Sequence, residues 1–154
     1  MQNHYNLVYR EEEREMIPLR LDQGVGVIPW SPLARGFLAG NRKPGGSEDT
    51  VRAKTDPMAK NMYFRDSDFA VADATVKVAS QRGVTPAQVA CAWILQAPRV
   101  TAPIVGATKL NHVKELLASA DIKLTREEVA ALEQPYQPHP VLGFEPPKPA
   151  KMLR

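Results

Sequence analysis

The stretch that decides the fold is Val25-Gly26-Val27-Ile28-Pro29-Trp30, which follows Gly24. This short apolar run has no polar alternation, and such runs are typical of strands buried on both faces of a parallel sheet. Glycine commonly ends helices, so Gly24 predicts that a helix over Glu11 to Asp22 stops just before this strand. The acidic start of that helix, Glu11-Glu12-Glu13, suits the positive end of the helix dipole and is expected to be a solvated face.

Two other segments have the character of strands. Gln2 to Tyr9 is rich in tyrosine, leucine and valine, which favour β structure. Thr101 to Val105 is a further short apolar run and is expected to be buried. The chain opens almost inside the first of these strands, so we expect an upstream segment that belongs to the same fold.

Helices are expected between and after these strands. Thr85-Pro86-Ala87-Gln88 joins a threonine cap, a proline in the first turn and a capping-box glutamine, and it starts a helix to about Gln96. Thr125 to Glu128 is a second capping box, before a short helix to about Gln134. The remaining expectations are a long loop over Ser31 to Ser67, a helix capped by Asp68 that runs to about Gln81, and a helix from about Leu110 to Ser119.

Strands and helices therefore alternate, and alternating βα units predict an α/β fold with a parallel sheet covered by helices. We expect one domain over residues 1–134 and a proline-rich extended tail over 135–154. Three strands cannot close a barrel, since a complete (βα)8 barrel needs about 250 residues.

The composition excludes several classes of function. The net charge is only +3 with no run of Lys and Arg, so no nucleic-acid partner is expected. No apolar run approaches the roughly 20 residues of a membrane helix. One cysteine, Cys91, and the lack of a signal-peptide pattern favour the cytoplasm. The histidines are too far apart for a zinc site, so no metal is expected.

Two stretches follow predicted strands, where parallel α/β folds bind their ligands. Trp30 to Gly40 combines an aromatic ring that can stack on a flat group with a serine and glycines that let the backbone approach a phosphate. The alternative is a strand that ends in a core aromatic residue and a tight turn.

The other stretch is Gly106-Ala107-Thr108-Lys109, at the start of a predicted helix. A helix N-terminus offers free amides and a positive dipole to an anion, and Lys109 adds charge. His112 lies one turn further on. The alternative is a plain strand-to-helix turn. Two such stretches at one edge of a sheet together favour a phosphate-bearing ligand.

These stretches resemble the aldo-keto reductases, in particular their bacterial and potassium-channel-β-like branch. The resemblance covers nearly the whole chain and is carried by Gln2-Asn3-His4-Tyr5-Asn6-Leu7, Gly24 to Gly40, Gly83 to Ala90, Pro103 to Thr108, and Pro135 to Pro140. It implies that the chain is part of a (βα)8 TIM barrel, approximately its last three βα units with a C-terminal helix and tail. It also implies an enzyme that reduces aldehydes and ketones with NADPH.

The resemblance assigns cofactor contacts to residues of both stretches and of the first strand. Gln2 would bind the nicotinamide carboxamide, and Trp30 would stack on the nicotinamide ring. The residues assigned to the phosphates are Ser31, Pro32, Leu33, Gly36 and Leu38 around the pyrophosphate, Arg52 at the 2′-phosphate, and Gly106, Thr108 and Lys109 at the adenosine phosphate. His112 and Glu115 would hold the adenine.

The chain departs from the family pattern in three places and lacks one part of it. His112 stands where Gln or Arg is usual, Leu116 where Asn is usual, and Asn41 where Lys is frequent. The family's catalytic Asp, Tyr, Lys and His come from the first four units, and no residue here maps onto them. No catalytic residue is therefore assigned.

Three hypotheses follow. The chain is the cofactor-binding part of an NADPH-dependent oxidoreductase that acts on small carbonyl compounds and lacks the catalytic tetrad. Alternatively, it is a non-catalytic nucleotide-binding or assembly module, which associates with itself or with a complementary half-barrel. In the third case it is a truncated, inactive fragment.

Overall fold

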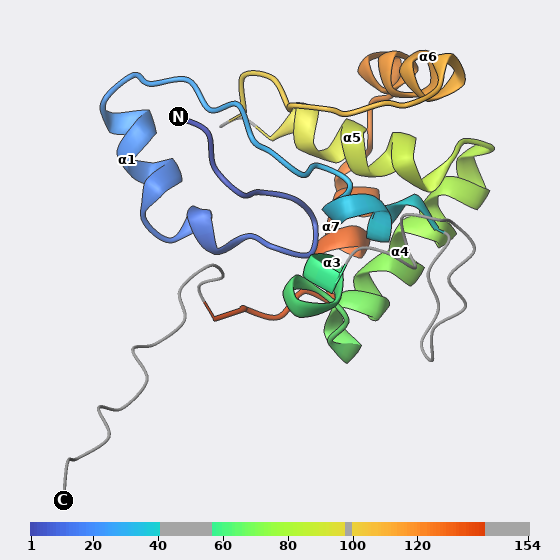
Figure 1. The fold of residues 1–154 in the computed structure, drawn as a ribbon, viewed down its shortest axis with the longest axis horizontal. Helices are drawn as coiled ribbons and strands as arrows, with labels where there is room; N and C mark the ends of the chain where they lie inside the picture. Colours follow the sequence, from blue (N-terminus) through green and yellow to red (C-terminus); the bar gives the residue numbers. More distant parts are fainter. Residues whose placement is uncertain (41–56, 98–99, 141–154) are drawn as a thin grey trace, which may run out of the picture.

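A computed structural model describes residues 1–40, 57–97 and 100–140. Three extended segments lie side by side, and helices flank them (Figure 1). The helical elements in chain order are η1 (Glu11–Glu13), α1 (Met16–Asp22), η2 (Ala34–Ala39), α3 (Pro57–Met62), α4 (Asp66–Arg82), α5 (Pro86–Gln96), α6 (Leu110–Ala118), η3 (Ser119–Asp121) and α7 (Arg126–Glu133).

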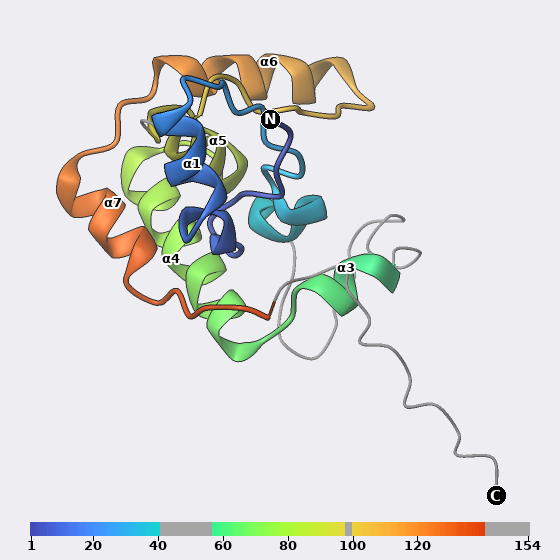
Figure 2. The same ribbon diagram turned by 90° about the vertical axis from the view of Figure 1, so that its left-hand side faces the viewer.

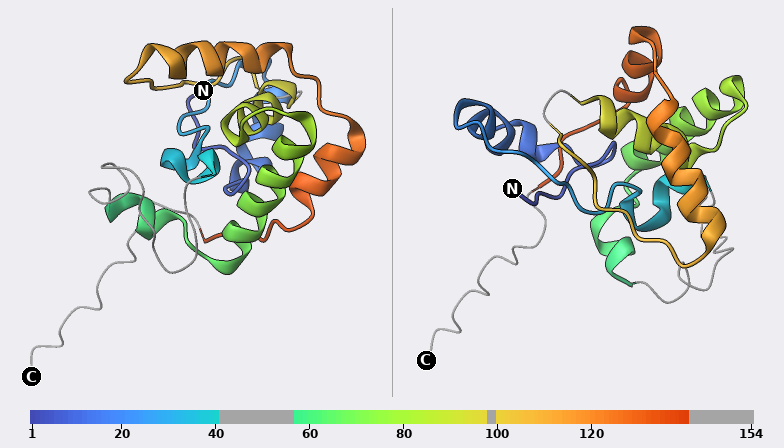
Figure 3. Two further views of the ribbon diagram at one scale, coloured as in Figure 1. Left: turned by 90° about the vertical axis from the view of Figure 1, so that its right-hand side faces the viewer. Right: turned by 90° about the horizontal axis from the view of Figure 1, so that it is seen from above.

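Helices α4, α5 and α7 form the body against which the first extended segment packs. The buried side chains between them include Tyr5, Leu7, Ile17, Phe37, Val71, Val89, Ile94 and Leu132. Helix α6 runs across the end of this body, next to α5 (Figure 2). The left view in Figure 3 shows the same crossing of α6 from the opposite side of the molecule.

The two capping boxes form as predicted. Thr85 Oγ1 accepts the N–H of Gln88 at 3.2 Å, and the N–H of Thr85 donates to Gln88 Oε1 at 3.0 Å. Thr125 and Glu128 repeat this exchange at the start of α7. Each box satisfies N–H groups that the first turn of a helix leaves free, so α5 and α7 begin where the sequence indicates.

Two helix boundaries differ from the prediction. Helix α4 begins at Asp66, and Asp68 sits in its first turn, where its carboxylate accepts the N–H of Arg65 at 3.0 Å. The helix expected over Glu11 to Asp22 is divided into η1 and α1. Pro18 explains the break, because it has no N–H and its ring would clash with the carbonyl four residues earlier. The loop predicted over Ser31 to Ser67 contains η2 and α3 among its described residues.

The three predicted strands are present only as extended segments joined by isolated bridges, and the described residues contain no regular strand. Pro29 and Pro103 explain the interruption, because neither has the N–H that its rung of a parallel ladder needs. The N–H of Val27 donates instead to the side-chain oxygen of Thr101, at 3.2 Å. The segments are parallel, as predicted, but a continuous ladder does not form.

The segments are buried on one side only. Val27 and Pro29 are buried, whereas Ile28 and Ile104 are each 42% exposed. The prediction that the central run is buried on both faces is therefore wrong, because the described residues leave the face of Ile28 partly exposed. Register places Ile28 and Ile104 on the face that carries Trp30, and we call the surface of Ile28 and Ile104 the open face.

Among the described residues, no helix is both long and apolar enough to cross a membrane.

Candidate functional site

The three extended segments are parallel, so their C-terminal ends meet at one rim. Bridges join His4 to Trp30 and Trp30 to Ile104. The N–H of Trp30 donates to the carbonyl of Asn3 at 2.9 Å, and the N–H of Ile104 donates to the carbonyl of Pro29 at 2.8 Å. The stretches Trp30 to Gly40 and Gly106 to Glu115 therefore leave the segments from neighbouring positions.

The backbone after Trp30 is unusual. Ser31, Ala34 and Arg35 have φ values of 58°, 47° and 55°, in the left-handed region that non-glycine residues rarely adopt. Gly36 continues the left-handed turn with φ 89°. Strained backbone of this kind collects at ligand-binding sites when the surrounding structure enforces it.

Hydrogen bonds within the loop fix this conformation. Ser31 Oγ accepts the N–H of Arg35 at 3.2 Å, and the carbonyl of Leu33 accepts the N–H groups of Gly36 at 2.9 Å and Leu38 at 3.2 Å. These amides are occupied by the loop's own acceptors. They set the shape of the loop, and in this conformation a phosphate would have to bind other donors.

The side chains of the loop differ in exposure. Pro32 and Leu38 are buried, so their side chains form part of the core, whereas Ser31, Leu33 and Gly36 are half-buried. Gly40 ends the loop against α5, where an added Cβ would lie 2.8 Å from Pro86 Cγ. The loop is thus anchored at both ends, by Ser31 and by Gly40.

Trp30 is the outer member of a stack of rings. His4 stacks on Trp30 with centroids 4.2 Å apart and planes 16° apart, and Tyr9 stacks on the other face of His4 at 4.2 Å and 15°. We call Trp30, His4 and Tyr9 the ring column. His4 Nε2 lies 2.6 Å from Tyr63 Oη, so the buried imidazole has a hydrogen-bond partner.

Asn6 and Tyr63 also belong to this site, and sequence reasoning did not identify either of them. Asn6 is fully buried, donates from Nδ2 to the carbonyl of Ser31 at 2.9 Å, and accepts the N–H groups of Val8 and Tyr9 at 3.0 Å each. The one available signal is that a buried asparagine must satisfy its amide, so a polar residue within the apolar run from Tyr5 to Val8 marks a tertiary contact.

Burial keeps the His4–Tyr63 pair neutral. Burial, followed by repulsion from His139, lowers the pKa of His4 to about 4. Burial also raises the pKa of Tyr63 to about 12. At neutral pH the hydrogen bond between Tyr63 Oη and His4 Nε2 therefore joins two uncharged groups.

The second stretch lies exposed at the rim. Gly106, Thr108, Lys109 and His112 are all exposed, and no side chain caps the start of α6. The first turn of α6 carries no acidic residue, so its positive end and Lys109 face solvent together. This arrangement suits an anion.

The other predicted cofactor residues lie in different surroundings. Gln2 is exposed on the first segment. The carboxylate of Glu115 accepts a hydrogen bond from the hydroxyl of Thr85, which ties α6 to α5. Arg52 and Asn41 lie outside the described residues.

The predicted solvated face of Glu11-Glu12-Glu13 is wrong for Glu11, which is only 8% exposed. Its carboxylate accepts the Tyr136 hydroxyl at 2.6 Å and the N–H of His139 at 2.7 Å. These partners lie more than a hundred residues away, so no local pattern reveals them. The start of the predicted tail, residues 135–140, is extended but packed into the fold; 141–154 lie outside the described residues.

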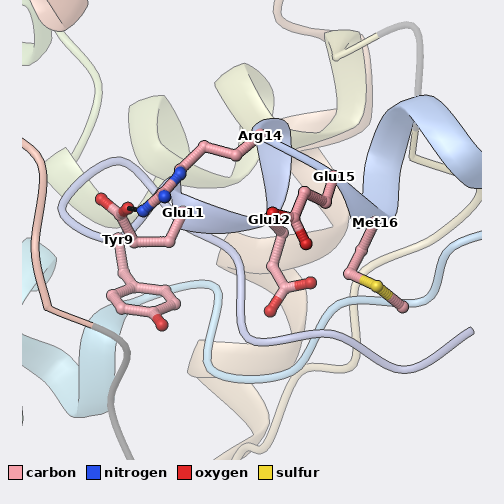
Figure 4. A pocket seen from close by; sticks show the side chains of 6 residues that line it. All are labelled: Tyr9, Glu11, Glu12, Arg14, Glu15 and Met16. Carbon is pink, nitrogen blue, oxygen red and sulfur yellow. Dashed lines mark hydrogen bonds and ion pairs between the residues drawn. The ribbon is translucent and has the colours of Figure 1, made fainter.

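Two cavities lie away from the predicted cofactor residues. One of about 220 Å³ is lined by Tyr9 and by side chains between Glu11 and Met16. There Arg14 extends toward Glu11, while Glu12 and Glu15 lie next to each other (Figure 4). Another of about 370 Å³ lies beside Arg10 and Trp93. No described group of three His, Cys, Asp or Glu residues is arranged to hold a metal ion.

Comparison with known proteins gives one consistent result. The family model described as "Aldo/keto reductase family" matches residues 1–137. Similar relatives are versiconal hemiacetal acetate reductase of Aspergillus parasiticus, 46% identical over 141 residues, and an aldo-keto reductase of Fusarium vanettenii, 42% identical over 147 residues. A Schizosaccharomyces pombe protein, whose name assigns it provisionally to the aryl-alcohol dehydrogenases, is 43% identical over 143 residues.

These matches cover 90–93% of this chain but 38–40% of each relative. The chain therefore spans about two fifths of the length of these curated relatives.

Proposed function

Because the chain belongs to the aldo/keto reductase family, an oxidoreductase family, we propose that it is the NADPH-binding part of a carbonyl reductase. On this proposal its three parallel segments correspond to the last three βα units of the family's barrel. The bacterial and potassium-channel-β-like branch stays a prediction, since the relatives named above are fungal.

One observation carries this proposal. The left-handed loop at Ser31, Ala34 and Arg35 and the uncapped start of α6 both follow segments that are bridged at Trp30 and Ile104. The free helix N-terminus suits an anionic group, and the strained loop at the same rim shapes the wall beside it, so together they suit a phosphate-bearing ligand. A dinucleotide with a 2′-phosphate is such a ligand.

Each proposed contact has a physical role. Trp30 offers a flat, half-buried ring for the nicotinamide, and the exposed amide of Gln2 can hydrogen-bond the carboxamide. Lys109 and the start of α6 attract the adenosine phosphate, with His112 one turn away. Ser31, Leu33 and Gly36 form the wall near the pyrophosphate, with Pro32 and Leu38 buried behind it in the core, and Arg52 and Glu115 complete the proposed set.

The chemistry that NADPH supplies when bound is a hydride for a carbonyl carbon. The residues of this chain bind and orient the dinucleotide, and no described residue is assigned the donation of a proton. We therefore propose that the proton donor of the family reaction belongs to the part of the relatives that this chain does not match. A small aldehyde, ketone or hemiacetal is the proposed substrate class.

Calorimetric titration of the purified chain with NADPH and NADH tests this function. We expect measurable binding of NADPH, weaker binding of NADH because it lacks the 2′-phosphate, and no NADPH oxidation with an aromatic aldehyde. Binding of neither dinucleotide would contradict the cofactor role, and steady aldehyde turnover would contradict the absence of a proton donor.

A second function, assembly with a complementary half-barrel, is favoured by exposed apolar side chains. Ile28 and Ile104 form the open face, and Leu110, Val113 and Leu117 form a stripe on α6 that is 41–69% exposed. Surfaces of this kind mark protein contacts. Light scattering with and without a separately produced N-terminal half of a relative tests it; a homodimer of this chain would redirect the assignment to self-association.

A further inference from the structure

The outer ring of the ring column is Trp30, the residue that the proposed function places against the nicotinamide. Resting on that function, we propose that His4 is a positioning residue, which holds the indole of Trp30 in the plane that the nicotinamide requires. His4 would not touch the reacting atoms. It would act only through Trp30.

His4 is confined on both faces. Trp30 and Tyr9 lie at the same centroid distance from it, 4.2 Å, with planes within 16° of parallel, and the residue is only 7% exposed. The imidazole cannot tilt out of its plane without pushing one of these two rings away. Close-packed interiors resist such displacement, so the plane of His4 fixes the plane of Trp30.

A hydrogen bond fixes the remaining freedom of the imidazole. His4 Nε2 meets Tyr63 Oη at 2.6 Å, and Tyr63 is itself 3% exposed. The tyrosine ring also meets His4 edge-on, at 5.9 Å and 62°. His4 is therefore held in its plane by the stack and against rotation by the hydroxyl.

The inner end of the ring column rests on a rigid support. The N–H of Tyr9 donates to Asn6 Oδ1, and the ring of Tyr9 meets His139 edge-on at 5.9 Å. His139 in turn bonds Asp68 at 2.7 Å. Displacement of the ring column inward would therefore break buried polar contacts.

The outer end has no comparable second support. Trp30 is half-buried, and within the described residues His4 is the one ring that stacks on it. Its neighbour Ser31 is held through the carbonyl that accepts from Asn6. The backbone at Trp30 is thus fixed by hydrogen bonds, whereas the orientation of its side chain depends on His4.

Titration with two ligands distinguishes a positioning role of His4 from a folding defect in its variants. The whole chain is titrated by calorimetry with NADPH and with 2′-phospho-ADP-ribose, which has both phosphate groups but no nicotinamide. We expect His4→Ala to weaken NADPH binding by about three- to tenfold, the range of one aromatic stack, and to leave 2′-phospho-ADP-ribose within about twofold of wild type. His4→Phe keeps a ring in the stack and should restore most of the NADPH affinity.

An equal loss for both ligands would overturn the positioning role, since a folding defect affects both alike. Unchanged NADPH affinity in His4→Ala would overturn it as well. A wild-type chain that binds 2′-phospho-ADP-ribose as tightly as NADPH would show that the nicotinamide makes no contact for His4 to prepare.

A cofactor-free measurement distinguishes this proposal from failure of the proposed function. The chain has two tryptophans, so Trp93→Phe leaves Trp30 as the sole emitter. In that background we expect His4→Ala to raise acrylamide quenching of Trp30, and His4→Phe not to do so. In the matched Trp30→Phe background the same His4 variants should leave the acrylamide quenching of Trp93 unchanged. Equal quenching of Trp30 with and without His4 would refute the proposal even if NADPH binds.

Discussion

The side chains of Asp68 and His139 meet at 2.7 Å across 71 positions of sequence, and each is only 2% exposed. The contact fastens the segment after α7 to the first turn of α4. The same carboxylate also accepts the N–H of Arg65. One side chain thus joins a helix start to a distant part of the chain.

Asp68→Ala should therefore destabilise the fold strongly. Removal of one partner leaves a buried imidazole and a helix N–H without acceptors, which costs about 3–5 kcal/mol of unfolding free energy. Urea denaturation followed by circular dichroism measures the change. Asp73→Ala, at an exposed position of the same helix, is the matched control and should stay within about 0.5 kcal/mol of wild type. A loss for Asp68→Ala as small as the control's would contradict the role of this contact.

The stability of the chain should fall on acidification between about pH 6.5 and 4. The pKa of His4 is lowered from 6.5 to about 4, so in this window the unfolded chain binds a proton that the folded chain does not. Unfolding is therefore favoured as the pH falls, by an amount on the order of 3 kcal/mol by pH 4. His4→Phe should flatten this part of the profile, as measured by urea midpoints at pH 7, 6 and 5. Parallel profiles for both proteins would disprove it.

Trp30→Ala should weaken NADPH binding by about tenfold, because the nicotinamide loses its stacking partner. Tyr136→Ala is the comparison, since this ring packs beside Arg10 and bonds Glu11, away from the rim. It should change NADPH affinity by less than about twofold at a temperature where both variants stay folded. Calorimetry gives both values, and equal losses would remove Trp30 from the nicotinamide site.

Gly40→Ala should disturb the loop more than Gly36→Ala. Both glycines have positive φ, but a Cβ on Gly40 would meet Pro86 Cγ at 2.8 Å, whereas a Cβ on Gly36 would meet nothing within 4 Å. We expect a loss of about 1 kcal/mol at Gly36 from backbone strain alone and about 2–4 kcal/mol at Gly40, where overpacking adds to it. Thermal unfolding of the two variants measures the difference, and the reverse order would show that the loop end is free to move.

Local chemistry allowed the sequence to predict the helices and the position of the rim. Each capping box closes within four residues, so Thr85 and Thr125 mark the true starts of α5 and α7. The resemblance to a family also holds, because its motifs are short and contiguous.

Contacts between distant residues were not predictable in the same way. Glu11 is buried by Tyr136 and His139, and His4 reaches Tyr63 across 59 positions. Hydrophobic pattern also overestimated strand formation, because it takes no account of the N–H that Pro29 and Pro103 lack. Of the candidate site, the sequence predicted Trp30 but not the rings behind it.

The open face has a practical consequence for handling the protein. Ile28, Ile104 and the stripe of α6 expose apolar surface to water. The net charge of only +3 gives weak electrostatic repulsion between molecules. Colloidal behaviour in concentrated stocks is thus governed by these side chains. We expect kosmotropic salts such as ammonium sulfate to precipitate the chain early, and mild detergent to keep it dispersed.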